Sequence, residues 1–544
     1  MSLKKELFLG ILLQLLLLIF LLISDQIQFA TNDDTTMVAI ASGGYGQPSE
    51  YVVNMHIVLG KAFKFLFNIF PNINWITVFY IFSYVIGVFQ LDYLVSITYC
   101  SKWERVIAFS IITLCFFICI NHFTFTVLAY WCGMIAFVSF FAIDFSKKEF
   151  GIVIVMPFIF AFLAVLIRAE VIKSLSIIYL AVSINKSINN KMIYFFMLSL
   201  MGISICSHNY MMNSDNKEKS FYQWGEIRSE ALDCKQIPYD KEKFDVVGIS
   251  EAQYEALYGA FYYCYDSVNI DVLSKLIELN GVSNKYNLDL YEYYNYKISQ
   301  HKNILEFDNI HVLLFYCVVI IMSSRKNKSL IVRVLFFTII TEFIFWCINR
   351  PLYRVVMPGY IFSSLVLLFS RNIKFNVYKK STVVILMLLF SFSYLCSVKT
   401  SMLSPVSTVH KEVRQYMIKY ENKVFLAGNP SVFSIGVTDS IWSVPLRWNL
   451  MGNWEIYSVP YLYYMETYHG DVDPKNILYS AINNNDILIL TSEGDLFVTK
   501  SKWILELINQ YYDKDCHFEK FDVVAEDKNE HWVVYRLIET KRMN

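Results

Sequence analysis

The sequence is poor in charged residues. Asp, Glu, Lys and Arg together make up 17% of its 544 residues, whereas a typical soluble domain has about 25%. Hydrophobic residues reach 56%, and the mean hydropathy is +0.41. This shortage of charge excludes an ordinary soluble globular protein and predicts a polytopic membrane protein.

Motifs that would indicate several other functions are also missing. The eleven cysteines include no C-x-x-C pair, which argues against a zinc or thioredoxin-like site. The formal net charge is zero, so no nucleic-acid partner is expected. No internal repeat, low-complexity tract or glycine-rich phosphate loop is visible.

Long hydrophobic runs are present throughout the chain. A spanning helix needs about 20 mostly apolar residues, and on this basis the sequence predicts about eleven transmembrane helices. They cover residues 7–24, 75–98, 106–121, 126–143, 151–167, 171–185, 192–207, 310–323, 330–348, 355–370 and 382–398. The alternative for the first run is a signal peptide, but the run is long for one and lacks a clean A-x-A cleavage site before Asp33. Its removal would not change the orientation of the rest.

Lysine and arginine favour one side of these spans. With the N-terminus inside, the short inner loops hold most of them, including Lys147, Lys148, Lys379 and Lys380. This orientation predicts a multi-pass protein of the inner (plasma) membrane with a cytoplasmic N-terminus. The expected parts are a transmembrane module (1–207) with its first outer loop (25–74), a mostly helical extracytoplasmic loop (208–309), further transmembrane helices (310–398) and an extracytoplasmic α/β domain (399–544).

Local patterns support these two outer regions. Residues 424–428, 486–491 and 531–538 have the composition of strands, and 500–512 that of an amphipathic helix. In the middle loop, helices are predicted at 250–267, with Ser250 as N-cap, and at 268–281, with Gly281 as C-cap. Cys234 and Cys264 either pair there or remain two free thiols.

Ionisable side chains gather at the predicted outer ends of the spans. Such groups are costly at membrane depth and tend to mark substrate or ion pathways. The group therefore predicts a functional site on the outer face. Its members are Asp33, Asp34, His122, Arg168, Glu170, Arg350 and Arg354.

Each member of this group also has a structural interpretation. Asp34 could cap a short helix, whereas two adjacent carboxylates could supply a general base and a ligand to a metal or hydrogen-bond network. Arg168 could simply extend toward the interface, or it could bind a phosphate with its planar guanidinium. Arg350 and Arg354 are positive charges on the unusual side, which suits an anionic ligand. His122 is expected to be structural or solvated.

The stretch 49–70 is amphipathic. Polar residues Glu50, Asn54, Lys61, Lys64 and Asn68 fall on one helical face. The pattern predicts a helix lying in the membrane interface, because an added span would invert all later loops.

The chain resembles the GT-C superfamily of polytopic glycosyltransferases. The matching features are the acidic pair Asp33–Asp34 after the first span, the amphipathic segment 49–70 in the same loop, the many spans and the outer C-terminal domain. The W-W-D-x-G motif of oligosaccharyltransferases is missing, which argues against transfer of a whole glycan to asparagine.

The resemblance implies an inverting transfer of a sugar from a polyprenyl-phosphate carrier to a glycan or lipid acceptor at the outer face. Asp33 or Asp34 would take the acceptor proton, and Arg168, Arg350 or Arg354 would hold the phosphate. The implied reaction requires no cofactor. Some members use a divalent metal and others do not; Asp33 or Asp34 would be the ligand.

Two other functions fit parts of the sequence. An O-antigen-type polymerase or ligase would use outer arginines such as Arg350 and Arg354, without the acidic pair. A lipid-linked sugar transporter would need polar residues near the membrane midplane. The high content of Ile, Lys and Asn indicates a bacterial chain, for which surface polysaccharide or lipopolysaccharide assembly is the expected setting.

Overall fold

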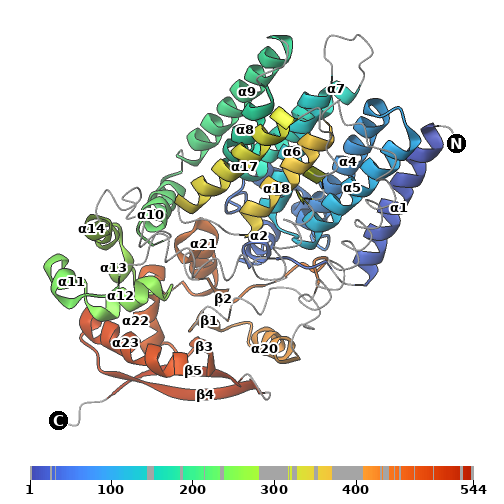
Figure 1. Cartoon of the computed structure of the whole chain (residues 1–544). Helices are drawn as coiled ribbons and strands as arrows, with labels where there is room; N and C mark the ends of the chain where they lie inside the picture. Colours follow the sequence, from blue (N-terminus) through green and yellow to red (C-terminus); the bar gives the residue numbers. More distant parts are fainter. Residues whose placement is uncertain are drawn as a thin grey trace.

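The computed structural model places helices in the first two thirds of the chain and a small sheet near its C-terminus (Figure 1). It describes residues 3–24, 27–30, 32–143, 152–183, 188–213, 215–232, 238–280, 316–317, 319–320, 328–347, 353–369, 408–428, 432, 440–445, 447–452, 455–470, 472–493, 495–526 and 531–540. The protein is mostly helical in these ranges. Arg350, Cys234, Gly281 and the predicted span 382–398 lie outside them.

Three of the described helices are long and apolar enough to cross a membrane: α4 (Trp75–Thr98), α5 (Lys102–Asn121) and α6 (Phe125–Ala142). Shorter apolar stretches lie in three further helices. These three are α1 (Leu3–Ile23), α7 (Ile152–Arg168) and α18 (Tyr353–Leu368). The bundle also contains α8 (Glu170–Ser183), α9 (Ile188–Met212) and α17 (Lys328–Cys347). The predicted number of spans and their orientation remain predictions.

Helix α6 lies at the centre of the bundle. Every one of its residues is buried, and it packs against α4, α7, α8 and α18. Small residues allow these close approaches. A Cβ on Gly133 would lie 2.5 Å from Leu175 of α8, and one on Gly87 of α4 would lie 2.3 Å from Ile135 of α6.

The first loop forms two helices, α2 (Asn32–Ser42) and α3 (Ile57–Ile69). The helix predicted at 49–70 is therefore too long by about two turns. Helix α3 begins only after His56, which is its N-cap: the His56 side chain accepts a hydrogen bond from the Val58 N–H. Glu50 lies before the helix but still forms an ion pair with Lys64, at 2.5 Å.

The described part of the middle region, up to Asn280, is mostly helical, as predicted. It contains α10 (Asn216–Leu232), α11 (Lys241–Val247), α12 (Glu251–Tyr258), α13 (Tyr265–Val268) and α14 (Ile270–Asn280). Ser250 is the N-cap of α12, where it forms a capping box with Gln253.

The continuous helix predicted at 250–267 is wrong, because residues 259–264 leave helical geometry to meet the sheet. The Tyr263 hydroxyl accepts a hydrogen bond from the Ala427 N–H and donates one to the Met451 carbonyl. Cys264 is a buried free thiol whose sulfur accepts a hydrogen bond from Tyr512.

The C-terminal region is an α/β unit around a five-stranded sheet of order β2-β1-β3-β5-β4. β1 is parallel to β2 and β3, while β5 is antiparallel to β3 and β4. Its strands are β1 (Val424–Ala427), β2 (Leu450–Met451), β3 (Ile487–Glu493), β4 (Cys516–Glu526) and β5 (His531–Glu539). Its helices are α20 (Thr408–Lys419), α21 (Val459–Tyr468), α22 (Ile477–Asn483) and α23 (Asp495–Tyr512), with short 3-10 turns at Glu455–Tyr457 and Pro474–Asn476.

The three predicted strands and the predicted helix at 500–512 are confirmed as β1, β3, β5 and α23. Two strands were missed. β2 has only two residues, and β4 is an edge strand whose several charged residues conceal its character.

The sheet unit packs directly on the helical bundle at the end that carries α2 (Figure 1). Asn74, the N-cap of α4, donates hydrogen bonds to the carbonyls of Ile441 (2.8 Å) and Ser443 (3.1 Å). The Trp448 N–H donates to the Gly44 carbonyl at 2.8 Å. The first loop and the sheet unit thus meet at one end of the bundle.

Candidate active site

Asp34 is completely buried in the first turn of α2, with 0% of its surface exposed. One carboxylate oxygen accepts hydrogen bonds from the Phe125 N–H, at 2.8 Å, and from the Tyr80 hydroxyl, at 3.0 Å. Phe125 is the first residue of α6, so the carboxylate satisfies a backbone donor that the helix cannot satisfy itself. Asp34 therefore fastens α2 to α4 and to the start of α6.

Asp33 lies one residue earlier and has a different environment. Its carboxylate is 22% exposed, and Oδ2 lies 3.8 Å from a terminal nitrogen of Arg354 on α18. At that distance the contact is an ion pair and not a short hydrogen bond. The side chain of Arg354 is 29% exposed. Both groups can therefore reach a ligand at this end of the bundle.

Arg168, the last residue of α7, lies at the start of α6 as well. It donates a hydrogen bond of 2.7 Å to the Thr126 hydroxyl, and its guanidinium lies 5.1 Å from the centre of the Phe125 ring. Its Nε is 3.8 Å from the exposed carboxylate of Glu170. The first two residues of α6 thus connect Asp34 with Arg168.

His122 lies in the short connection between α5 and α6, where it is the C-cap of α5. Burial lowers the pKa of His122 to about 4, so its imidazole is neutral near pH 7. The neighbouring Phe123 carbonyl accepts a hydrogen bond from the Ala30 N–H, and Phe29 and Phe123 form an isolated parallel bridge. This connection therefore anchors the chain just before the two aspartates.

The structure thus brings together most of the ionisable residues predicted from the sequence. Asp34 and Arg168 meet at the start of α6, Asp33 pairs with Arg354, and Glu170 pairs with Arg168. His122 lies in the connection that leads into α6. Arg350 lies outside the described residues.

Sequence reasoning missed a histidine pair beside this site. The rings of His56 and His208 lie 4.7 Å apart. Nδ1 of His56 accepts from the Val58 N–H and Nδ1 of His208 from the Ile57 N–H, so both rings are held neutral. Burial lowers both pKa values, that of His208 to about 4. The pair was hidden because His56 falls inside the helix predicted at 49–70.

A buried carboxyl group was missed too. Glu218 in α10 is 2% exposed, and burial together with Asp215 and Glu50 raises its pKa to about 8. Glu218 is therefore mostly protonated at pH 7. Tyr51 of the first loop donates a hydrogen bond to Asp215 at 3.4 Å, which attaches this region to the same end of the bundle. No sequence pattern indicated the contact, because it joins segments far apart in the chain.

The described residues do not form a metal site. Among them, no group of three or more His, Cys, Asp or Glu side chains is placed to hold a metal ion. The sequence predicts Asp33 or Asp34 as the ligand if a metal is used, and one oxygen of Asp34 already accepts two protein hydrogen bonds.

Comparisons with known proteins give no match: neither a family model, nor a curated protein, nor a solved structure is significantly similar to the chain. The functional assignment therefore depends on the residues and their geometry.

Proposed function

We propose that this protein is a membrane glycosyltransferase. It moves a sugar from a polyprenyl-phosphate carrier to a glycan or lipid acceptor at the outer face, in the assembly of a surface polysaccharide or lipopolysaccharide. The observation that supports this most strongly is the pair formed by Asp33 and Arg354, two partly exposed opposite charges at the start of α2.

The two charges suit the two ends of such a reaction. In the transfer, the acceptor oxygen bonds to the anomeric carbon, the bond from that carbon to the phosphate oxygen breaks, and polyprenyl phosphate leaves. Asp33 is the general base that takes the acceptor proton. Arg354 balances the charge that builds up on the leaving phosphate, because a guanidinium matches phosphate oxygens with several donors.

Asp34 and Arg168 support these two groups. Asp34 is buried and its accepted hydrogen bonds fix the first turn of α2, so it positions Asp33 without touching the substrate. Arg168 keeps a partly exposed guanidinium at the start of α6 and supplies a second positive charge for the phosphate.

A lipid-linked donor also needs an apolar surface for its tail. Helix α17 packs against α18, which carries Arg354. It exposes Val332, Phe336, Ile339 and Phe343, which are spaced to lie on one helical face. A carrier whose phosphate is held by Arg354 would keep its tail in the bilayer along this face.

The test is the surface-glycan profile of a strain that lacks the protein, complemented with single variants at matched membrane levels. Asp33→Asn should abolish the discrete sugar, since loss of a general base alone costs about 10²- to 10⁴-fold. Arg354→Gln should do the same, because the leaving phosphate then loses its balancing charge. Glu104→Gln is the control. Glu104 lies in the first turn of α5, whereas the candidate site lies beyond the last turn of that helix, near His122. Full complementation by Asp33→Asn with failure of Arg354→Gln would contradict the mechanism and favour an arginine-centred polymerase or ligase.

One observation favours the transporter as a second candidate. Asp92, inside α4, is buried and accepts a 3.4 Å hydrogen bond from Gln14 of α1, while its other oxygen has no partner among the described residues. Buried carboxylates in a bundle are typical of transport pathways. An Asp92→Asn variant with a normal glycan profile would exclude an essential role for this carboxylate; loss of the glycan with the lipid-linked precursor accumulating inside would favour transport.

A further inference from the structure

Close to the contact between Trp448 of the sheet unit and Gly44 of the first loop lies an arginine, Arg447, that has no carboxylate partner among the described residues. Arg447 lies just before β2, and its guanidinium stacks on the ring of Tyr468, with Cζ 4.1 Å from the ring centre. Among the described residues, no Asp or Glu lies within ion-pair distance of Arg447, and its buried Nε has no hydrogen-bond acceptor. An unsatisfied buried donor on a charged group is costly and calls for an explanation.

A second unsatisfied nitrogen lies in the same cluster. Nε2 of His469 is buried and has no partner among the described residues. The His469 ring is 5.6 Å from that of Tyr464, which in turn is 5.2 Å from that of Tyr468. Burial and the charge of Arg447 lower the pKa of His469. The cluster thus offers two polar nitrogens among aromatic rings.

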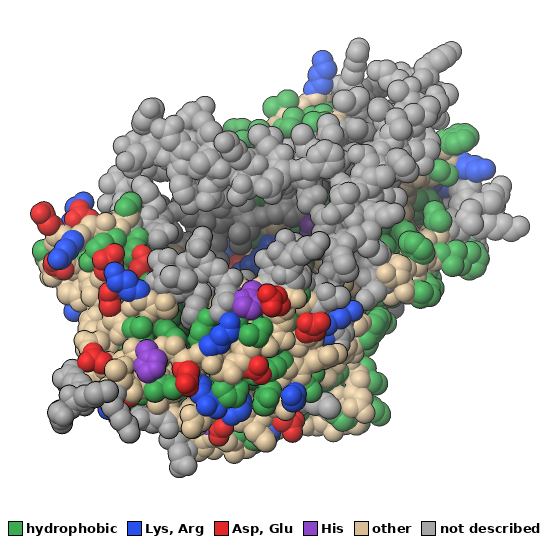
Figure 2. Space-filling view, turned by 90° about the horizontal axis from the view of Figure 1, so that it is seen from below, with side chains coloured by type: hydrophobic (Ala, Val, Ile, Leu, Met, Phe, Trp, Pro, Cys, Tyr) green, Lys and Arg blue, Asp and Glu red, His purple; other side chains and the backbone are tan. Residues whose placement is uncertain are grey.

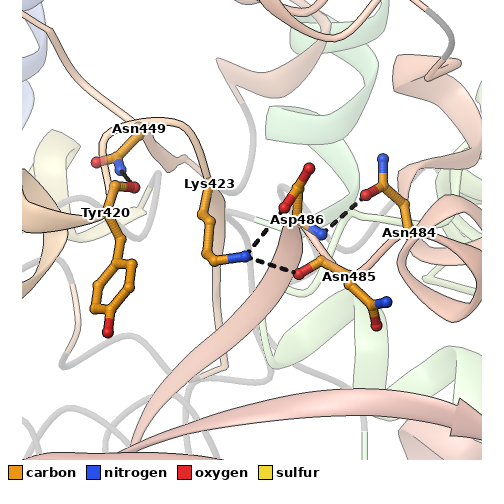
Figure 3. Close-up of polar contacts among 6 residues, drawn as sticks. All are labelled: Tyr420, Lys423, Asn449, Asn484, Asn485 and Asp486. Atoms are coloured by element: carbon orange, nitrogen blue, oxygen red, sulfur yellow. Dashed lines mark hydrogen bonds and ion pairs between the residues drawn. The ribbon is translucent and has the colours of Figure 1, made fainter.

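The carboxylate that influences the pKa of His469, that of Asp486, is paired with a lysine. Asp486 opposes the effect of Arg447 on the pKa of His469. Figure 3 shows Asp486 held by Lys423, whose Nζ donates to the carboxylate at 3.0 Å and to the Asn485 carbonyl at 3.2 Å. The guanidinium of Arg447 itself interacts with the Tyr468 ring and with the neutral Tyr464 hydroxyl, so no described carboxylate neutralises its charge.

The cluster is open to solvent on one side and closed by the first loop on another. Tyr468 is 41% exposed. Gly46, with φ of +103°, comes so close that a Cβ there would lie 2.8 Å from Tyr463 and 3.2 Å from Tyr468. Viewed from the end that carries the sheet, acidic and basic side chains are interspersed, so no general field of one sign would attract an anion (Figure 2). Binding must come from this local arrangement.

We infer that Arg447, Tyr468 and His469 form a binding site for an oxyanion, a carboxylate or phosphate group on the acceptor. A planar guanidinium binds such groups through two parallel hydrogen bonds, and the exposed Tyr468 ring offers a face for the sugar carrying the group. The identity of the acceptor as a glycan depends on the proposed function, but the oxyanion site does not.

Isothermal titration of the full-length protein in nanodiscs tests this directly. The probes are glucuronate, glucose, inorganic phosphate and, separately, nanodiscs with or without anionic lipid. Glucuronate should bind saturably and glucose at least about tenfold more weakly, because a charge-assisted hydrogen bond is lost. Competition by phosphate would extend the site to phosphate groups. Loss of glucuronate binding only in anionic nanodiscs would assign the site to lipid headgroups and overturn the acceptor assignment.

Variants locate the site. Arg447→Gln should weaken glucuronate binding about tenfold to a hundredfold, and Tyr468→Leu severalfold. Lys475→Gln is the matched control, because Lys475 stacks on Tyr265 at 4.7 Å in another part of the same region. Equal binding by wild type and Arg447→Gln, or no glucuronate binding at all, would overturn the inference. Since this readout needs no sugar transfer, its failure is distinct from failure of the proposed reaction.

Discussion

The two ends of α2 meet arginines in opposite electrostatic situations. At its start, Arg354 faces the carboxylate of Asp33 and Arg168 faces that of Glu170. Past its other end, Gly46 lies against Tyr468, on which Arg447 stacks with no carboxylate partner in the described structure. A paired arginine is positioned in advance and stays neutralised until a ligand competes. An unpaired one lowers the stability of the empty protein and gains most from an added anion.

At the start of α2, variants of the two adjacent aspartates should affect stability and activity separately. The largest effect on stability is expected for Asp34. Asp34→Ala leaves the Phe125 N–H and the Tyr80 hydroxyl buried without that acceptor, which should cost about 3 kcal/mol. Asp33→Ala removes only a partly exposed ion pair and should cost less than about 1 kcal/mol. Thermal unfolding in detergent measures both. Equal losses of stability would show that Asp33 is structural as well.

The pH dependence of stability tests the neutral histidine pair beside this region. The pKa of His208 is about 4 in the folded protein against an ordinary value of 6.5, and that of His56 is also lowered. The unfolded chain therefore binds protons more readily. Stability should be unaffected by this pair above pH 6.5, fall as the pH drops from 6.5 toward 4, and then level off.

Between pH 7 and pH 5 the loss should be about 1 to 2 kcal/mol. His208→Asn is the informative control, because the Asn amide oxygen can accept the hydrogen bond of the Ile57 N–H without titrating. Its unfolding temperature should depend less on pH than that of the wild type in this range. The same pH dependence in both proteins would contradict the assignment.

At the Arg447 cluster, removing the arginine is expected to raise stability or leave it unchanged, whereas removing Arg354 lowers it. Arg447→Met keeps the apolar stem over Tyr468 and removes a charge with an unsatisfied Nε. The unfolding temperature of the ligand-free protein should stay unchanged or rise, with a gain of at most about 1 kcal/mol. Arg354→Met should lower it, because Asp33 then loses its partner. A clear loss of stability in Arg447→Met would mean that the arginine supports the fold.

Local patterns in the sequence were sufficient for much of the fold. Runs of β-branched and aromatic residues identified three strands, and Ser250 as a possible N-cap identified the start of α12. These features depend on neighbours within a few residues. The acidic pair could be recognised in the sequence because Asp33 and Asp34 are consecutive residues.

The division of roles between the two aspartates could not be predicted. It depends on Phe125, Tyr80 and Arg354, which approach only after folding. The Arg447 cluster was missed because it joins the segment before β2, the end of α21 and the first loop, none of which forms a motif alone. The break of the helix predicted at 250–267 likewise arises from the hydrogen bonds of Tyr263 to two strands.

The smallest expected effect concerns the Lys423–Asp486 pair, and it tests whether that pairing leaves Arg447 free. The Asp486 carboxylate is 59% exposed, so Lys423→Gln should cost less than about 0.5 kcal/mol of stability. The variant also leaves one more uncompensated negative charge in reach of His469, which should weaken glucuronate binding about twofold, less at high salt. Titration at low and high ionic strength measures this. Unchanged binding in Lys423→Gln at low salt would mean that the charge of Asp486 does not reach the anion site, so that its pairing with Lys423 has no bearing on Arg447.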